Sequence, residues 1–439
     1  MADAVGDSIL SKVIWRLLPF VMLLGVVHQY DRINISFAAL QMNKDLGLTA
    51  TAYGFGAGLF SLTTFFLEVP ANYLQMRVGT RRWFARIMIT WGVAAMAMSL
   101  ITGPYTFYLM RFLLGAAEAG FLAGAMFYFR LWLPARVRGR VLGTFASYSL
   151  IAFFTGAPLS TAIMTATEGA FGLRGWQMMY VIEGAPAVLL AFVVLYYLPD
   201  KPAEARWLSP AEQQWLSRTL EAEKAAQTRG VESFWHALID RRVLLVALLC
   251  FFLLVTNFGL SFWLPQIIKS FGKLSNNEVG WLAAIPYLLA MPTMFFWGRH
   301  SDRSGDRRWH LISGYLCSAL GFTLAAFSSA PLTIMIGICI GCVGLYSTFG
   351  VFWALPSDFL SGGAAAAGLA VANSGGALGG FFGPYLMGFL RDRTQGFAAS
   401  LLVLACSGVC AALVSACLRN EWRREHDAAT EGPAPSSVR

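Results

Sequence analysis

Apolar residues along this chain gather in long runs that are separated by short polar segments. Each run has about 20 residues or more, the length that an α-helix needs to cross a hydrocarbon core of about 30 Å. The sequence therefore predicts an all-α membrane protein with about twelve transmembrane helices in two six-helix bundles. The predicted spans are 14–39, 52–76, 83–102, 105–130, 141–164 and 177–198 in the first half, and 243–270, 278–298, 309–328, 331–355, 364–389 and 397–418 in the second.

The longest polar segment lies between the two sets of apolar runs. It carries charges of both signs, with Trp207, Trp215 and Leu220 at roughly helical spacing, which predicts a linker with a surface helix. The end of the chain is charged and then rich in Ala, Pro and Ser, which predicts a disordered tail. We expect four parts: an N-terminal bundle at 1–198, the linker at 199–242, a C-terminal bundle at 243–418 and the tail at 419–439.

Composition supports a membrane protein and argues against a nucleic-acid partner. The chain is 57% hydrophobic and 13% charged, whereas a soluble domain is roughly 45–50% apolar and about 25% charged. The net charge of +9 does not predict nucleic-acid binding, because Lys and Arg fill short gaps between apolar runs and form no single basic face. We therefore expect the lipid bilayer as the surrounding medium and no nucleic-acid partner. We also expect a monomeric protein.

Loop charges predict the orientation, since cytoplasmic loops carry an excess of Lys and Arg. One side of the predicted bundle collects Lys12, Arg16, Arg77, Arg81, Arg82, Arg86, Arg130, Arg136, Arg138, Arg140, Arg299, Arg303, Arg307, Arg308, Arg419, Arg423 and Arg424. The other side has only Lys44, Arg174, Lys269, Lys273, Arg391 and Arg393. Both termini and the linker are therefore expected on the cytoplasmic side.

Two short loops on that side repeat one pattern at the same place in each half. Repeated halves are common in secondary transporters, which bind substrate near the midplane. Gly allows a tight turn, and Arg can pair with carboxylates and helix C-terminal ends, so we predict a conformational latch. Its residues are Gly79, Arg81 and Arg82 in the first loop and Asp302, Arg303, Gly305, Arg307 and Arg308 in the second. The alternative is an ordinary loop whose charge only sets the orientation.

With Gly298 at its start, the second loop resembles the signature loop of the major facilitator superfamily. The first copy departs from it, because Met76 and Asn72 stand where an acidic residue and a Gly are expected. That departure resembles one branch, the anion:cation symporters, which includes bacterial sugar-acid, tartrate and aromatic-acid permeases and the vesicular glutamate transporters. Further stretches that resemble this branch are Tyr30-Asp31-Arg32-Ile33-Asn34, Glu68-Val69-Pro70-Ala71-Asn72, Arg111 to Gly120, Phe262-Trp263-Leu264-Pro265-Gln266 and Asn373-Ser374-Gly375-Gly376.

The resemblance implies a major facilitator fold and secondary active transport. It implies proton-coupled uptake of a small organic anion, a carboxylate, by alternating access across the bacterial inner membrane. Exchange of one anion for another and export of drug-like compounds remain alternatives within transport. A polytopic sensor is disfavoured, because the linker is too short for a signalling domain.

Several ionisable residues fall inside predicted spans, where a charge is costly and indicates function, and four of them stand out. Asp31 and Arg32 lie in the first span, and Arg111 and Glu118 lie two helical turns apart in the fourth. If these spans line one cavity, the two acids and two arginines meet there. An arginine fits a carboxylate with forked donors, and a substrate that competes for it frees an acid to take a proton.

The resemblance assigns roles to these residues. Asp31 and Glu118 are similar to proton-coupling acids, Arg32 to the ligand of the substrate carboxylate, and Arg111 to a partner that tunes Asp31 or assists binding. Asn34 shares a helix face with Asp31 and joins the substrate-binding candidates. The alternative is a structural ion-pair cluster. For His28, a turn earlier, three roles remain open: a proton shuttle, a packed histidine that donates one hydrogen bond, and a position that tunes the substrate.

The second half offers polar and aromatic residues in its spans and few charges. Tyr346, Trp353, Asn373 and Ser374 are candidates to bind the rest of the substrate by hydrogen bonds and stacking, or else pack helices together. We find no metal-ligand set, no nucleophile with an adjacent base and no phosphate-binding loop, so the sequence predicts neither an enzyme nor a metal or cofactor beyond the coupling protons.

Overall fold

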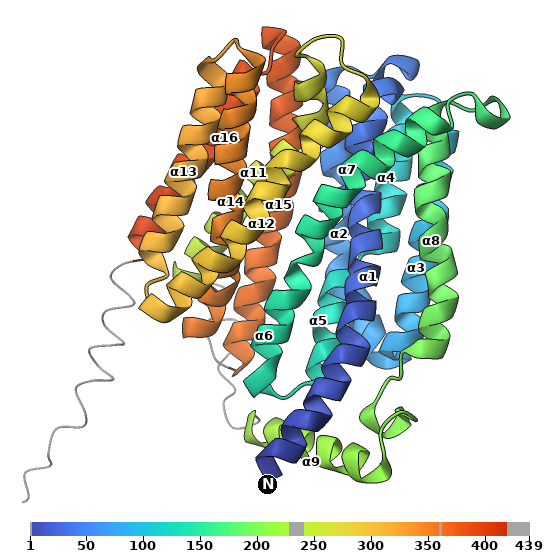
Figure 1. The fold of residues 1–439 in the computed structure, drawn as a ribbon, viewed down its shortest axis with the longest axis vertical. Coiled ribbons are helices and arrows are strands. Elements are labelled where there is room, and N and C mark those ends of the chain that lie inside the picture. The colour runs from blue at the N-terminus through green and yellow to red at the C-terminus, as the bar shows by residue number, and fades with distance from the viewer. Residues whose placement is uncertain (1, 228–240, 360–361, 419–439) are drawn as a thin grey trace, which may run out of the picture.

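The computed structural model describes residues 2–227, 241–359 and 362–418, and these residues form helices and connecting loops without a β-strand. Two helical bundles stand side by side with their long axes aligned (Figure 1). The first contains α1 (Ala2–Asp45), α2 (Ala50–Val78), α3 (Thr80–Ala97), α4 (Pro104–Glu118), α5 (Phe121–Trp132), α6 (Ala135–Ala146), α7 (Tyr148–Ala166) and α8 (Gly175–Tyr197). The second contains α11 (Arg241–Lys269), α12 (Asn276–Ser304), α13 (Arg308–Phe327), α14 (Pro331–Phe359), α15 (Gly362–Thr394) and α16 (Ala398–Cys417).

The helices have the length and surface that a bilayer requires. Within the described residues, eleven helical spans are long and apolar enough to cross a membrane when α4–α5 and α6–α7 are each taken as one. The 33-residue α15 is the twelfth helix of membrane length. Large apolar side chains such as Phe66, Phe296 and Phe327 are exposed on the bundles, as expected for surfaces that face lipid. The predicted all-α fold of two six-helix bundles is confirmed.

Two predicted spans are interrupted, which corrects the expectation of continuous helices. The span predicted at 105–130 breaks between α4 and α5, where Gly120 has a positive φ of 87° and Ala119 is extended. The span predicted at 141–164 begins earlier and divides at Ser147 into α6 and α7. The break makes Glu118 the last residue of α4. This end of α4 lies beside α1.

The linker helix α9 (Pro210–Gln227) is attached to the first bundle. Lys12 Nζ lies 3.1 Å from Glu212 Oε2, and Arg138 Nη2 lies 2.6 Å from Glu223 Oε1. Hydrogen bonds from the Ser209 backbone and from Lys12 hold the pKa of Glu212 below its usual range. The predicted tail at 419–439 and the linker residues 228–240 lie outside the described residues.

The two bundles meet at the end of the molecule away from the N-terminus. At that end, Asp392 of α15 accepts hydrogen bonds from the backbone N–H groups of Ala50 (3.1 Å) and Thr51 (2.7 Å), the first residues of α2. Tyr53 of α2 donates to the carbonyl of Phe262 at 2.9 Å. Thr165 of α7 and Asn277 of α12 add a further hydrogen bond between the two bundles, at 3.2 Å. The structure is therefore closed at the end opposite the N-terminus.

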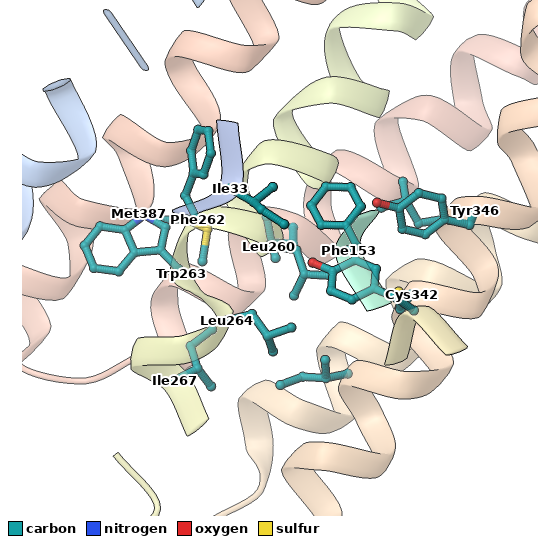
Figure 2. Packing of buried hydrophobic residues seen from close by; sticks show 14 of the residues in the cluster. Ile33, Phe153, Leu260, Phe262, Trp263, Leu264, Ile267, Cys342, Tyr346 and Met387 are labelled. Carbon is teal, nitrogen blue, oxygen red and sulfur yellow. The ribbon is translucent and has the colours of Figure 1, made fainter. Parts of the chain in front are cut away.

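Apolar packing closes the same region. Figure 2 shows Ile33 of α1 close to Leu260 of α11, and Phe153 of α7 beside Tyr346 of α14. The ring of Phe153 also stacks on Tyr287 of α12, with centroids 4.5 Å apart and planes 10° apart. One continuous hydrophobic core thus crosses from the first bundle to the second.

Candidate functional site

Asp31 and Arg32 are neighbours on helix α1, but their side chains contact different partners. Successive residues of an α-helix are about 100° apart around the axis. Arg32 Nε lies 3.4 Å from Glu118 Oε2, so α1 and the end of α4 are joined as predicted. Asp31 accepts a hydrogen bond of 2.6 Å from the indole of Trp91 on α3.

Glu118 is the centre of the first group. Its Oε1 lies 2.8 Å from His28 Nε2, and its Oε2 faces Arg32. His28 lies one turn before Arg32 on α1 and stacks on Phe121 of α5, with ring centroids 4.5 Å apart. The side chains of His28 and Glu118 are buried, whereas that of Arg32 is 17% exposed. A buried carboxylate therefore has one permanent cation and one titratable imidazole beside it.

Asp31 belongs to a second polar group on the α3 and α8 side of α1. Its Oδ1 has no hydrogen-bond partner among the described residues. Asn34 is buried on the same face of α1 and lies beside Glu183 of α8. Glu183 in turn accepts a hydrogen bond of 2.6 Å from Ser160 of α7. Two buried carboxyl groups, those of Asp31 and Glu183, thus lie on this side of α1.

Arg111 is not the partner of Asp31, which corrects the expectation that both acids and both arginines form one cluster. Its guanidinium donates to the backbone carbonyls of Gly56 (3.3 Å) and Ala57 (3.2 Å) on α2. The ring of Phe60 lies near both arginines, with the Cζ atoms of Arg32 and Arg111 each 4.9 Å from its centroid. Arg111 thus fastens α4 to α2, and it lies near Arg32 only through the ring of Phe60 that both arginines share.

Among the four charged residues, Arg32 is the one whose side chain is partly exposed. The residues Asp31, Arg111 and Glu118 are at most 2% exposed. Because Arg32 is partly exposed and has a single ion-pair contact, at 3.4 Å, its remaining donors are available to another acceptor. Arg32 therefore combines partial exposure with a contact to a buried carboxylate, and its role in binding an anion stays a prediction.

The candidates in the second bundle are placed on α14 and α15. Tyr346 is buried and donates a hydrogen bond of 2.8 Å to Asn257 of α11. Trp353 is half-buried and packs against Phe352, with centroids 5.1 Å apart. Asn373 and Ser374 are half-buried on α15. No contact among the described residues joins Tyr346 or Trp353 to the arginines of the first bundle, so their role in substrate binding stays a prediction.

The two signature loops have similar backbone turns, but the acidic residues that contact them come from different places in the sequence. Gly79 and Gly305 both have positive φ, 92° and 67°. In the second loop Arg307 pairs with Asp302, and Asp306 accepts a hydrogen bond from the Trp309 backbone at 3.1 Å.

In the first loop, which has no acid at Met76, Asp200 accepts a hydrogen bond of 2.8 Å from the Arg81 backbone. Asp200 follows α8, so a residue distant in sequence caps α3. Arg82 and Arg303 are exposed, and Arg308 lies over the Trp309 ring at 5.2 Å. The latch role of these loops stays a prediction.

Sequence reasoning missed Trp91, Phe60 and Asp392. A tryptophan or phenylalanine in an apolar run looks like any core residue, so nothing in the sequence marks the contacts of Trp91 and Phe60. Asp392 looks like an ordinary charge at the end of a span. Within the described residues, no group of three or more His, Cys, Asp or Glu side chains could hold a metal ion.

Comparisons with known proteins agree with this architecture. A family model described as Major Facilitator Superfamily matches residues 21–273 and 267–438. A protein of Agrobacterium vitis named "Putative tartrate transporter" is 43% identical over 415 residues, covering 94% of this chain and 95% of the relative. A "Quinolone resistance transporter" of Acinetobacter baumannii is 41% identical over 400 residues, covering 91% and 92% of the two chains.

Solved structures share the fold at low identity. The xylose transporter XylE from E. coli, in a partially occluded inward open conformation, superposes with a TM-score of 0.74 at 15% identity, covering 92% of this chain and 99% of that one. A bacterial homologue of the lysosomal transporter Spinster, inward-facing and occupied, gives 0.72 at 14% identity over 96% and 98%. Relatives and neighbours are transporters, which confirms the prediction that the chain is not an enzyme. The family match and the relatives at 41 and 43% identity show that this multi-pass membrane protein belongs to the major facilitator superfamily.

Proposed function

We propose that this protein imports a small organic carboxylate together with protons across the bacterial inner membrane by alternating access. The observation that carries the proposal is the contact of a partly exposed Arg32 with a buried Glu118 at 3.4 Å. In the proposed orientation both termini are cytoplasmic, so the closed end faces the outside and the structure represents an inward-facing state.

Coupling follows from competition for Arg32. A substrate carboxylate offers two oxygens to the guanidinium fork, a stronger arrangement than the single Nε contact to Glu118. Once Arg32 turns to the substrate, Glu118 is left buried with less positive charge beside it, and its ionised form becomes costly. A proton then binds, and the loaded protein carries substrate and proton through the conformational change.

The membrane potential makes this coupling useful. An anion that enters a negative interior works against about 2.3 kcal/mol per charge for each 100 mV. A proton that enters with each negative charge cancels this cost. Transport of the bare anion would instead need a concentration gradient large enough to overcome the membrane potential.

The substrate class rests on the relatives and on the site. The relative named for tartrate is matched over nearly its full length, and Arg32 suits a carboxylate. The alternative, export of a drug-like compound, is favoured by the similarity to a protein named for quinolone resistance. Quinolones also carry a carboxylate, so direction of transport and the size of the ligand distinguish the two proposals.

A thermal-shift panel on the purified protein tests the substrate class. A ligand that binds only the folded state at 100 times its Kd adds about 2.7 kcal/mol of stability. We expect tartrate, a sugar acid or an aromatic acid to raise Tm, and the uncharged sugar of matching size to leave it unchanged. A rise with a quinolone alone would overturn import of a small carboxylate in favour of drug transport.

Asp392 provides a test of the proposed alternation between inward-facing and outward-facing states. Its hydrogen bonds to the start of α2 join the two bundles at the closed end, where a negative charge also interacts favourably with a helix N-terminus. The change Asp392→Asn should therefore weaken the closed end by about 0.5–2 kcal/mol and raise the outward-open population about two- to thirtyfold. Spin labels on Lys44→Cys and Lys273→Cys, in a background without the seven native cysteines, should report longer distances by pulsed electron paramagnetic resonance.

The matched control for this experiment is Asp45→Asn. Asp45 lies at the same end and pairs with Arg174 at 3.2 Å, but both residues belong to the first bundle. This change should leave the distance distribution as in the wild type. Equal distributions for Asp392→Asn and the wild type would show that Asp392 does not hold the closed end together.

A further inference from the structure

We propose that His28 and Glu118 together hold the proton that accompanies the substrate, so that His28 sets the pH range of coupled transport. The inference rests on the proposed function and adds a third titratable group to it. It starts from the position of His28 Nε2, 2.8 Å from Oε1 of the same carboxyl group whose Oε2 faces Arg32. His28 and Arg32 thus approach Glu118 from one helix and occupy different oxygens.

The imidazole is held in a dry aromatic setting. His28 is 1% exposed, stacks on Phe121 with planes 26° apart, and meets the edge of Trp91 at a centroid distance of 5.4 Å. Its Nδ1 has no hydrogen-bond partner among the described residues. Glu118 is therefore the polar group with which this imidazole exchanges a proton, and packing keeps Nε2 aimed at it.

The proton balance follows from the charges in contact. With Arg32 beside Glu118, one positive and one negative charge compensate each other, and we take His28, whose Nε2 lies 2.8 Å from Glu118 Oε1, as neutral in this state. When a substrate carboxylate draws Arg32 away, the pair binds one proton from solution. That proton forms an O–H bond on Glu118 or a second N–H bond on His28, and in the latter case an imidazolium–carboxylate pair results. Two alternative places for a proton bind it more tightly than either place alone.

The other groups around His28 do not take its place as the second site for the proton. On α1 the neighbouring ionisable groups are Arg32 and Asp31, and Asp31 bonds to Trp91. Helices α3 and α5 contact the imidazole through Trp91 and Phe121, which do not titrate. Tyr148 of α7 packs on the preceding turn of α1 at Gly25, and a phenol stays protonated near neutral pH. Glu118 on α4 and His28 are thus the pair that titrates together.

The variant His28→Gln tests this inference, because Gln keeps an N–H donor for Glu118 and cannot take a second proton. Uptake of radiolabelled tartrate, or of the carboxylate with the largest shift in the panel above, is measured in proteoliposomes between about pH 5 and 8. We expect the midpoint of the pH profile to move to lower pH by about 0.5–1 unit, a roughly three- to tenfold loss of uptake above the midpoint. Uptake at the acidic end should stay near the wild-type value.

The control is Tyr30→Phe, which removes the 2.6 Å hydrogen bond to Thr155 from the same helix and changes no group that titrates near Glu118. Its pH midpoint should equal that of the wild type. A His28→Gln profile that is lowered at every pH without a shift, or is unchanged, overturns the inference while leaving the proposed function in place. Loss of pH dependence in the wild type itself would instead contradict the proposed function.

If His28→Gln folds poorly, isothermal titration calorimetry on the wild-type protein tests the inference instead. Titration with the same carboxylate in two buffers of different ionisation enthalpy gives the number of protons bound per ligand. We expect proton uptake on binding that persists above the pH range of a lone carboxyl group, as a shared imidazole requires. Proton uptake confined to acidic pH would overturn the assignment to the pair.

Discussion

The variant Glu118→Gln is expected to lose proton-driven uptake of the carboxylate and to keep exchange of labelled for unlabelled carboxylate across the membrane. The introduced amide resembles the protonated acid in shape and charge, so the substrate-loaded protein can still change conformation. The amide can neither bind nor release a proton, and an imidazolium at the buried His28 would lack its carboxylate partner, so an imposed pH gradient no longer drives accumulation. The two modes are measured in the same proteoliposomes, and we expect a loss of about a hundredfold or more in the first, as for a step that requires general acid–base chemistry.

The control for Glu118→Gln is Glu278→Gln, which removes a carboxylate from the exposed start of α12. It should retain both modes. The variant Asp31→Asn should behave as Glu118→Gln if Asp31 is the second coupling acid. Equal loss of uptake and exchange in Glu118→Gln would mean that this acid, with Arg32 and His28, only holds the bundle together.

The variant Arg32→Lys is expected to bind the carboxylate roughly 10- to 100-fold more weakly although the positive charge is kept. Lysine presents a point charge without the planar fork, so at least one charge-assisted hydrogen bond, worth about 1.5–3 kcal/mol, is lost. Isothermal titration calorimetry measures the change directly. Arg174→Lys is the matched control, because Arg174 pairs with Asp45 at the surface. An unchanged Kd in Arg32→Lys would show that Arg32 does not bind the carboxylate.

The sequence was sufficient for the architecture because a bilayer imposes simple length and polarity rules. Twelve apolar runs and charged loops at regular intervals have few alternatives to two helical bundles. The breaks after Glu118 and at Ser147 could not be predicted, since glycines within apolar runs are also common helix-packing residues. Whether Gly120 takes a positive φ depends on the helices packed around it.

Prediction of the site was limited because the sequence does not show how each helix is rotated about its own axis. The sequence placed Arg32 and Glu118 at similar depths, and the structure joins them. It also placed Asp31 in that cluster, whereas the structure turns Asp31 to Trp91, because only tertiary packing decides which neighbour faces each side of α1. His28 was recognised as a candidate from its spacing, but its contact with Glu118 depends on the end of α4. The hydrogen bonds of Asp392 to α2 join residues more than 300 positions apart in the sequence, so no local sequence pattern could predict them.

Proton movement with the substrate is the central claim, and a pH-sensitive dye inside sealed proteoliposomes tests it most directly. The carboxylate is added outside at equal internal and external pH, with the membrane potential clamped to zero. The account predicts that the interior acidifies as the carboxylate is taken up, that a protonophore abolishes the pH change, and that Glu118→Gln shows neither uptake nor acidification. Uptake of the carboxylate without any change of internal pH would contradict the account.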